Sequence, residues 1–299
     1  MGNSGSIPKL VRDWLDAQND IKKQQAFINS ALAEPWIPQK SEKKEHEILA
    51  LRDERPGGLV PSEGVITLTA GIDTQDYGFY YVIRAWGLHM TSWLIRYGFV
   101  ETFDALDEVL FESEYLDVNG QRYIIQLSLI DAMGHRTAEV YQYCRGKVQV
   151  KPIKGEQRIN YPFKHSKIDF YPNGKPIPGG IILYRLNTNF FKDEIFNKLG
   201  VASGDPGAFY LHAETGDDYA AQMVAEFRND AGIWEQIGSK PNHYWDCEVY
   251  AMAAAHIIGI PRLKAAKIGP PKPETEGGRR LKHVPRIVRS EWMERSSFR

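Results

Sequence analysis

Cysteine is scarce in this chain, and no zinc-binding pattern is present. The 299 residues include two cysteines, Cys144 and Cys247, whose separation gives no metal-ligand spacing. The eight histidines are scattered along the chain and do not form a zinc pattern with them. We therefore expect no zinc site, and the low cysteine count favours a reducing compartment.

Long hydrophobic runs are also missing. No apolar run approaches the length of a membrane span, and no secretory signal is recognisable. The phosphate loop Gly-x-x-x-x-Gly-Lys-Ser/Thr does not occur either. The sequence therefore predicts no membrane partner and no ATP hydrolysis by this chain alone. Its composition, 42% apolar and 25% charged, is that of an ordinary globular protein.

Charge is unevenly distributed along the chain. The net charge is −1, but residues 261–299 hold eleven Lys and Arg against four Glu, which gives +7 there and leaves −8 for the rest. A basic tail on an acidic body fits a polyanion-binding protein whose carboxylates include metal ligands. A disordered tail that only improves solubility explains the same composition.

Turn and charge signals divide the chain into three parts. Residues 1–60 are interpreted as an N-terminal tag (1–6), a helical arm over 8–33 and a linker. Residues 61–260 form the main domain and residues 261–299 a basic flexible tail. In the main domain, residue patterns predict strands over 65–72, 79–86, 92–99, 123–130, 148–153, 208–212 and 234–237, and helices over 103–116, 135–144, 190–199, 217–229 and 242–255, the last capped by Asn242.

Residues 154–188 interrupt this alternation. They are rich in Pro, Gly, Lys and Tyr and predict a β-hairpin or a long loop, with residues 181–186 as the returning strand. Basic and aromatic residues alternate in this segment, which suits contact with a nucleic-acid backbone. An ordinary exposed hairpin is the other interpretation.

Three aspartates occupy unusual places in these predicted elements. Asp73 follows the first strand, and Asp131 follows the apolar strand 123–130. Asp246 lies on the apolar stripe of the last helix, and no Lys or Arg shares that stripe. A carboxylate in such a place needs a partner or a metal ion. Taken singly, Asp73 is also explained as a turn cap and Asp246 by a buried hydrogen bond.

Taken together, the three carboxylates suit hard divalent cations, which prefer oxygen ligands. A site without His and Cys ligands matches Mg²⁺ or Mn²⁺ better than zinc. Two such ions, about 3.5–4 Å apart, activate water and stabilise the leaving oxygen in a displacement at phosphorus. The three aspartates are therefore candidate ligands of divalent cations that act at phosphorus.

Several short segments resemble one known family. They are Gly71-Ile72-Asp73-Thr74-Gln75, Ile130-Asp131 with Gly134-His135-Arg136-Thr137, Pro152-Ile153-Lys154-Gly155, and the helix from Asp246 to Ala254. Together they are similar to the C-terminal nuclease domain of tailed-phage terminase large subunits of the GpA type. The resemblance covers residues 27–260. It implies a ribonuclease H-like α/β fold, in which helices flank a mixed β-sheet that carries an inserted β-hairpin.

The resemblance also implies a function and partners. The chain would be a two-metal-ion endodeoxyribonuclease in which the catalytic residues Asp73, Asp131 and Asp246 hold Mg²⁺ or Mn²⁺. The enzyme would cut concatemeric viral DNA during packaging. Double-stranded DNA, the small terminase subunit and the portal are the implied partners, in the host cytoplasm. The chain would be the nuclease part of a terminase without its ATPase. Candidate phosphate contacts are Arg136, Lys154, Lys164 and Lys167.

One departure from the family leaves alternatives open. The family has a Gly-Gly pair shortly after the second Asp, whereas Ala132-Met133-Gly134 supplies one glycine. We expect Met133 to narrow the approach of DNA or metal. Another ribonuclease H-like nuclease, such as a transposase or resolvase, is one alternative. A non-catalytic module that docks on DNA or the portal is the other.

Overall fold

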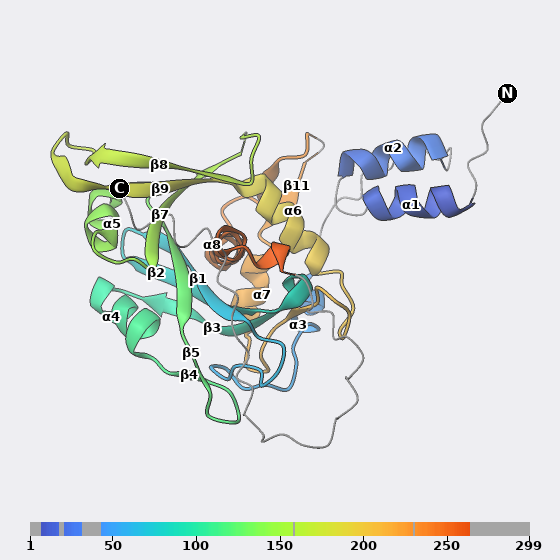
Figure 1. Cartoon of the computed structure of the whole chain (residues 1–299), viewed down its shortest axis with the longest axis horizontal. Coiled ribbons are helices and arrows are strands. Elements are labelled where there is room, and N and C mark those ends of the chain that lie inside the picture. The colour runs from blue at the N-terminus through green and yellow to red at the C-terminus, as the bar shows by residue number, and fades with distance from the viewer. Residues whose placement is uncertain (1–6, 18–20, 32–42, 158, 230, 264–299) are drawn as a thin grey trace, which may run out of the picture. The chain divides into compact units, whose positions relative to one another are not determined.

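The computed structural model describes residues 7–17, 21–31, 43–157, 159–229 and 231–263. Eight strands form one sheet: β1 (Thr67–Gln75), β2 (Gly78–Trp86), β3 (Ser92–Val100), β6 (Ile125–Asp131), β7 (Val150–Glu156), β8 (Phe163–Phe170), β9 (Pro176–Asn187) and β10 (Phe209–Tyr210). Their order is β10-β3-β2-β1-β6-β7-β9-β8 (Figure 1). Strands β1, β2 and β3 form an antiparallel meander, whereas β1, β6, β7 and β9 run parallel. The carboxyl ends of these four parallel strands therefore lie at one edge of the sheet.

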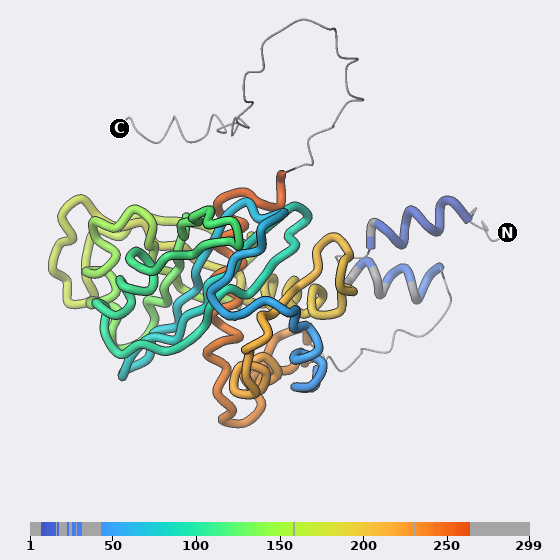
Figure 2. The backbone as a smooth tube through the Cα atoms, turned by 90° about the horizontal axis from the view of Figure 1, so that it is seen from below, coloured from blue at the N-terminus to red at the C-terminus, as the bar shows by residue number. Residues whose placement is uncertain are grey.

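Helices cover both faces of this sheet. The core on one face joins Ala70 and Ile72 of β1 to the segment formed by α4 (Phe103–Asp107) and the π-helical turn η2 (Glu108–Glu112), and to α5 (Thr137–Cys144). The core on the other face is built by α6 (Thr188–Lys198), α7 (Asp217–Met223) and α8 (His243–Ile258). Figures 1 and 2 both place α8 and α4 on opposite sides of the central strands. The predicted α/β architecture is confirmed, and this helix-flanked mixed sheet is consistent with a ribonuclease H-like fold.

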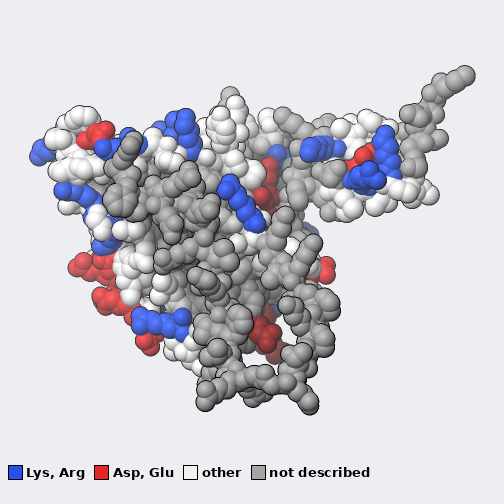
Figure 3. Space-filling view, in the orientation of Figure 1, with Lys and Arg blue, Asp and Glu red and all other residues white. Residues whose placement is uncertain are grey.

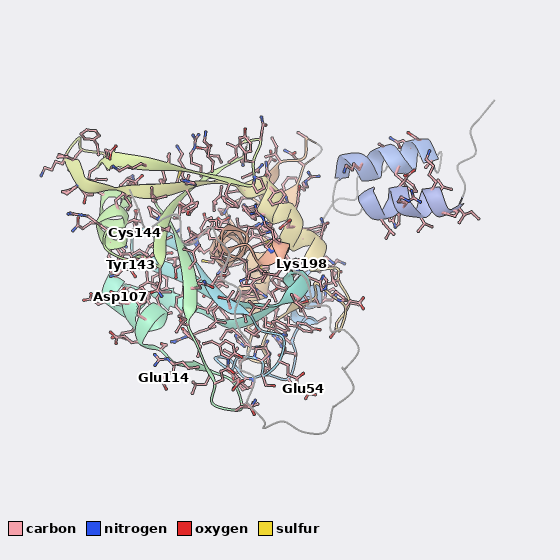
Figure 4. The ribbon with its side chains drawn as sticks, in the orientation of Figure 1. Glu54, Asp107, Glu114, Tyr143, Cys144 and Lys198 are labelled. Carbon is pink, nitrogen blue, oxygen red and sulfur yellow. The ribbon has the colours of Figure 1, made fainter. Side chains whose placement is uncertain are left out.

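Polar contacts tie helices to each other and to the sheet. Tyr143 of α5 donates to Asp107 Oδ1 at the end of α4 at 2.6 Å, and Lys147 Nζ lies 2.9 Å from Asp107 Oδ2 (Figure 4). On the other face, the fully buried Arg84 of β2 donates to both carboxylate oxygens of Glu248 in α8, at 2.6 and 2.7 Å. Burial of such a pair is tolerated because each charge is neutralised by the other. The Arg84–Glu248 pair fixes the position of α8 on the sheet.

Several predicted elements have different limits in the structure. The helix predicted over 8–33 is two helices, α1 (Ile7–Ala17) and α2 (Ile21–Ala31), whose Trp14 and Phe27 rings lie 5.4 Å apart. The sequence between the two helices contains Asn19 and Asp20, residue types that favour the start of a new helix. The helices predicted over 103–116 and 217–229 are also shorter. Each gives way to a strand of a two-stranded sheet: β4 (Tyr115–Leu116) pairs with β5 (Arg122–Tyr123), and β11 (Glu226–Arg228) with β12 (Trp234–Gln236).

The segment 154–188 is a hairpin. Its strands β8 and β9 pair in antiparallel fashion at the edge of the sheet. Residues 45–60, predicted to belong to the N-terminal arm and linker, contact the body: Ile48 of α3 (Glu45–Leu49) and Val60 are fully buried. The predicted tail lies outside the described residues from 264 onward. No helix in the described ranges combines the length and apolar character needed to cross a membrane.

Candidate active site

Asp73 and Asp131 lie side by side on neighbouring parallel strands. Ile72 of β1 pairs with Ile130 of β6, so the next residue of each strand is an aspartate. Alternation turns both carboxylates away from the face on which the two isoleucines are buried. The Thr74 hydroxyl donates to the Asp131 backbone carbonyl at 2.7 Å and joins the strand ends. Strand β1 extends beyond the predicted range 65–72 to Gln75, because β2 pairs with it as far as Gly78.

Helix α8 packs directly on β1. A Cβ atom on Gly71 would lie 1.9 Å from the Cys247 carbonyl oxygen and 2.6 Å from the Ala251 nitrogen, so only glycine fits there. Thr69, two residues earlier on the same face, donates to the Ala251 carbonyl at 2.8 Å. This close approach brings Asp246 in the first turn of α8 to the same edge of the sheet as Asp73.

The three carboxylates influence one another electrostatically. Burial, and then the charges of Asp73 and Asp246, raise the pKa of Asp131 to about 8, against hydrogen bonds from backbone amides. Burial and the same three carboxylates raise the pKa of Tyr250, which follows Asp246 by one helical turn. Like charges this close disfavour ionisation. The structure therefore gathers Asp73, Asp131 and Asp246 at one site.

Asp73 is held by two neighbouring side chains. Its Oδ2 lies 2.8 Å from His243 Nδ1 and accepts a hydrogen bond from Gln75 Nε2 at 2.7 Å. The His243 ring is stacked on Tyr80, with 4.3 Å between ring centroids. Because His243 opens α8 and Tyr80 pairs with Asp73 across the hairpin, these contacts fix the orientation of the Asp73 carboxylate.

Asp246 is paired with a lysine from another helix. Lys192 Nζ of α6 lies 3.1 Å from Asp246 Oδ1, and within 2.6 and 2.7 Å of the two oxygens of Glu226. Asn242 donates to Glu226 at 2.7 Å and to Asp246 at 3.0 Å, so its side chain does not cap α8 as predicted. Burial raises the pKa of Asp246, Lys192 opposes this shift, and Glu226 and Asp73 add to it, so that the pKa is about 6.

The carboxylate oxygens of the three aspartates suit a divalent cation, although other protein groups already contact some of these oxygens. Within the described ranges, no three His, Cys, Asp or Glu side chains are already arranged around one metal position. His243, Gln75 and Lys192 contact oxygens of Asp73 and Asp246 that a cation would use. The oxygen atoms of three mutually repelling carboxylates are the type of ligand that Mg²⁺ or Mn²⁺ prefers.

Comparison with known proteins identifies the family of this chain. The family model described as the endonuclease domain of the terminase large subunit gpA matches residues 3–266. The chain belongs to this family. It is 29% identical to the terminase large subunit of Escherichia phage lambda and 24% identical to that of Enterobacteria phage P21. Each comparison covers 83% of this chain and 41% of the relative, so the chain spans less than half of those proteins. None of the solved structures matches it.

The predicted phosphate contacts of this gpA endonuclease domain lie in different places. Lys154 of β7 pairs with Arg185 of β9, which pairs in turn with Lys164 of β8. These three exposed residues form a basic row across three strands, on the face opposite the buried Ile153, and Arg185 in this row is paired with Glu156 at 2.8 Å. Figure 3 shows basic side chains over this hairpin and acidic ones over α4. Lys167, also on β8, is paired with Asp169 at 3.1 Å.

Met133 and Arg136 follow Asp131 in the sequence, and their side chains are exposed to different extents. The Arg136 side chain, 16% exposed, is paired with Glu139 at 2.9 Å and lies over the Phe79 ring at 4.6 Å, so it supports the fold more than it faces a ligand. Met133 is 45% exposed, while its backbone N–H donates to Asp131 Oδ1 at 3.1 Å. The predicted narrowing of the site by Met133 stays a prediction.

Sequence reasoning missed the residues that surround the three aspartates. His243 and Gln75 offered a weak signal, because each is within three residues of a predicted ligand in sequence. Lys192 and Glu226 offered none, since they come from α6 and β11 and reach Asp246 only in the folded chain. Lys192 follows the buried Phe191, and its position among apolar residues of a helix was the only hint of burial.

Proposed function

We propose that this chain is the DNA endonuclease part of a terminase large subunit and cuts concatemeric phage DNA during genome packaging, with Mg²⁺ or Mn²⁺ as cofactor. The convergence of Asp73, Asp131 and Asp246 from β1, β6 and α8 carries the proposal. The family match to an endonuclease domain supports it. A nuclease needs such a concentration of negative charge to hold divalent cations against the phosphate backbone.

The cations would be held by the three aspartates. Asp73 and Asp131 would bind from neighbouring strands and Asp246 from α8, and bound divalent cations would activate water and stabilise the leaving oxygen in phosphodiester hydrolysis. His243 and Gln75 orient the Asp73 carboxylate. Asp131, whose pKa is about 8, must lose its proton to serve as a ligand. We expect two ions in the complex with DNA.

The biological setting is part of the same proposal. The lambda and P21 relatives are named terminase large subunits. By analogy, double-stranded DNA would be the substrate, the small terminase subunit and the portal would be protein partners, and the work would be done in the host cytoplasm. The basic row of Lys154, Arg185 and Lys164 offers a surface for the DNA backbone.

Plasmid nicking tests the catalytic proposal. With Mn²⁺ or Mg²⁺ we expect supercoiled DNA to be cut, and Asp73→Ala to lower the rate by about 100-fold or more, because one charge-stabilising group is lost. Asp76→Ala is the matched control, since its exposed carboxylate follows Asp73 by three residues and should be dispensable. Equal cutting by Asp73→Ala, or cutting without divalent ions, would contradict the proposal.

A non-catalytic docking module is the second candidate function. It is favoured by one observation, that His243 Nδ1 and Lys192 Nζ already contact oxygens of Asp73 and Asp246, at 2.8 and 3.1 Å. Calorimetric titration with Mn²⁺ distinguishes the two, because a docking module would show no binding that depends on Asp73, Asp131 and Asp246. Strand joining, or selective cutting of branched DNA, would instead identify another ribonuclease H-like enzyme such as a transposase or resolvase.

A further inference from the structure

A buried lysine lies beside one of the proposed ligands. Lys192 is 8% exposed, and its Nζ contacts both oxygens of Glu226 and one oxygen of Asp246, at 2.6, 2.7 and 3.1 Å. Asn242 Nδ2 donates to the same two carboxylates and holds them together. The two acidic side chains therefore share one ammonium, placed between them as a bridging cation would be.

The arrangement is asymmetric across the site. Lys192 Nζ lies 3.1 Å from Asp246 Oδ1, whereas Asp131 Oδ1 accepts a hydrogen bond from the uncharged Met133 backbone N–H at 3.1 Å. A lysine ammonium is a compact point charge, so it repels a divalent ion that approaches the same oxygens. Positive charge is thus already supplied at Asp246 and lacking at Asp131.

We propose that the Lys192 ammonium occupies, in the DNA-free protein, the place of a second divalent cation beside Asp246, so that the free chain binds one ion, at Asp73 and Asp131. This inference rests on the proposed function, because it assigns the order in which the cation positions fill. The second ion enters only when Lys192 leaves Asp246. A DNA phosphate bound at the site supplies negative charge that stabilises both cations there.

Counting bound Mn²⁺ tests this assignment without any cutting. Electron paramagnetic resonance of free Mn²⁺, during titration of the full chain without DNA, should give one tight ion per wild-type chain. Lys192→Met keeps the length of the side chain but removes its charge, and should bind two. Lys192→Arg keeps the charge and is the matched control, with one ion expected. Lys192→Met/Glu226→Gln should return to one ion, because the vacated position then loses a carboxylate.

The possible results separate the inference from the proposed function. Two tight ions in the wild-type chain, or one ion in Lys192→Met, would overturn the role of Lys192 and leave the nuclease proposal intact. No tight ion in any variant would contradict the cation site itself, and the role of Lys192 with it. If Lys192→Met does not fold, Lys192→Gln replaces it, since the amide can still donate to Glu226. If neither variant folds, the wild-type count decides, one ion supporting the inference and two overturning it.

Discussion

Ionisation of Asp131 lowers the stability of the ion-free protein as pH rises, and a single substitution can reveal this effect. Its pKa in the folded chain is about 8, whereas the pKa of an aspartate in an unfolded chain is about 4. Between these values the folded state binds more protons than the unfolded state, so the stability of the ion-free protein falls as pH rises from about 4 to about 8. Ionised Asp131 is thus unfavourable without a cation.

We expect Asp131→Asn to stabilise the ion-free protein near pH 8 while abolishing DNA cutting. The amide removes the buried charge, and even one pKa unit of relief corresponds to about 1.4 kcal/mol. Urea denaturation in the presence of EDTA at pH 5, 6.5 and 8 measures the effect, which should grow with pH. Asp76→Asn, at an exposed position, should show no such trend. An Asn variant that is no more stable than wild type at pH 8 would contradict this account.

Only some of the residues of the site could be predicted from the sequence. Asp73 and Asp131 stand at strand ends, and Asp246 on an apolar stripe, so their local context marked them as unusual. Lys192 and Glu226 become neighbours of Asp246 through the packing of α6 and β11 against α8. Sequence spacing along one element does not report a partner supplied by another, which is why the lysine on Asp246 was not foreseen.

At the level of elements, the contact between β1 and α8 depends on one glycine. A methyl group on Gly71 would meet backbone atoms of Cys247 and Ala251, which cannot rotate away as a side chain can. We expect Gly71→Ala to push α8 off the strand and to destabilise the protein by about 1–3 kcal/mol, the usual cost of overpacking, or more. Chemical denaturation gives the free energy of unfolding, and Mn²⁺ titration shows whether Asp246 still reaches the site.

Gly200→Ala is the appropriate comparison for that variant. A Cβ atom there lies 3.5 Å from the Asn197 carbonyl oxygen, an ordinary contact. It should therefore change the free energy of unfolding little. If Gly71→Ala were as mild as Gly200→Ala, the close packing of α8 on β1 would not be a requirement of the fold.

The elements that periodicity predicted well are those with one clear pattern. Strands β1, β2 and β3 and helix α8 were expected from β-branched runs and apolar spacing. The helices predicted over 103–116 and 217–229 were too long because β4 and β11 each find a partner strand, β5 and β12, later in the chain. Tertiary pairing overrides a local helical pattern in both places. The hairpin β8–β9 was left open against a loop because its register depends on the neighbouring β7.

For the whole molecule, the distribution of charge predicts where DNA binds. The row of Lys154, Arg185 and Lys164 crosses three strands, whereas the surface of α4 is acidic (Figure 3). We expect Lys154→Ala/Lys164→Ala to weaken DNA binding and to lower the slope of log affinity against log salt by about 2, since each phosphate contact contributes about 0.9. Fluorescence anisotropy with duplex DNA, in EDTA, at several salt concentrations measures this slope.

A control for that measurement lies on another sheet. Arg122 of β5 is half-exposed and paired with Glu114 at 3.7 Å, so Arg122→Ala removes a surface cation outside the row. Its salt slope should match that of the wild type. An unchanged slope in Lys154→Ala/Lys164→Ala would place the DNA on a different surface.

The hydrogen bond from Thr69 to Ala251 spans 182 residues of sequence. Contacts this distant in the chain form late in folding, because the entropy of closing so long a loop must be overcome before they stabilise anything. During synthesis, Asp73 and Asp131 emerge before α8. The nascent chain therefore has no complete acidic centre until residues 243–258 have been made and docked, so any cutting activity would require α8 to be in place.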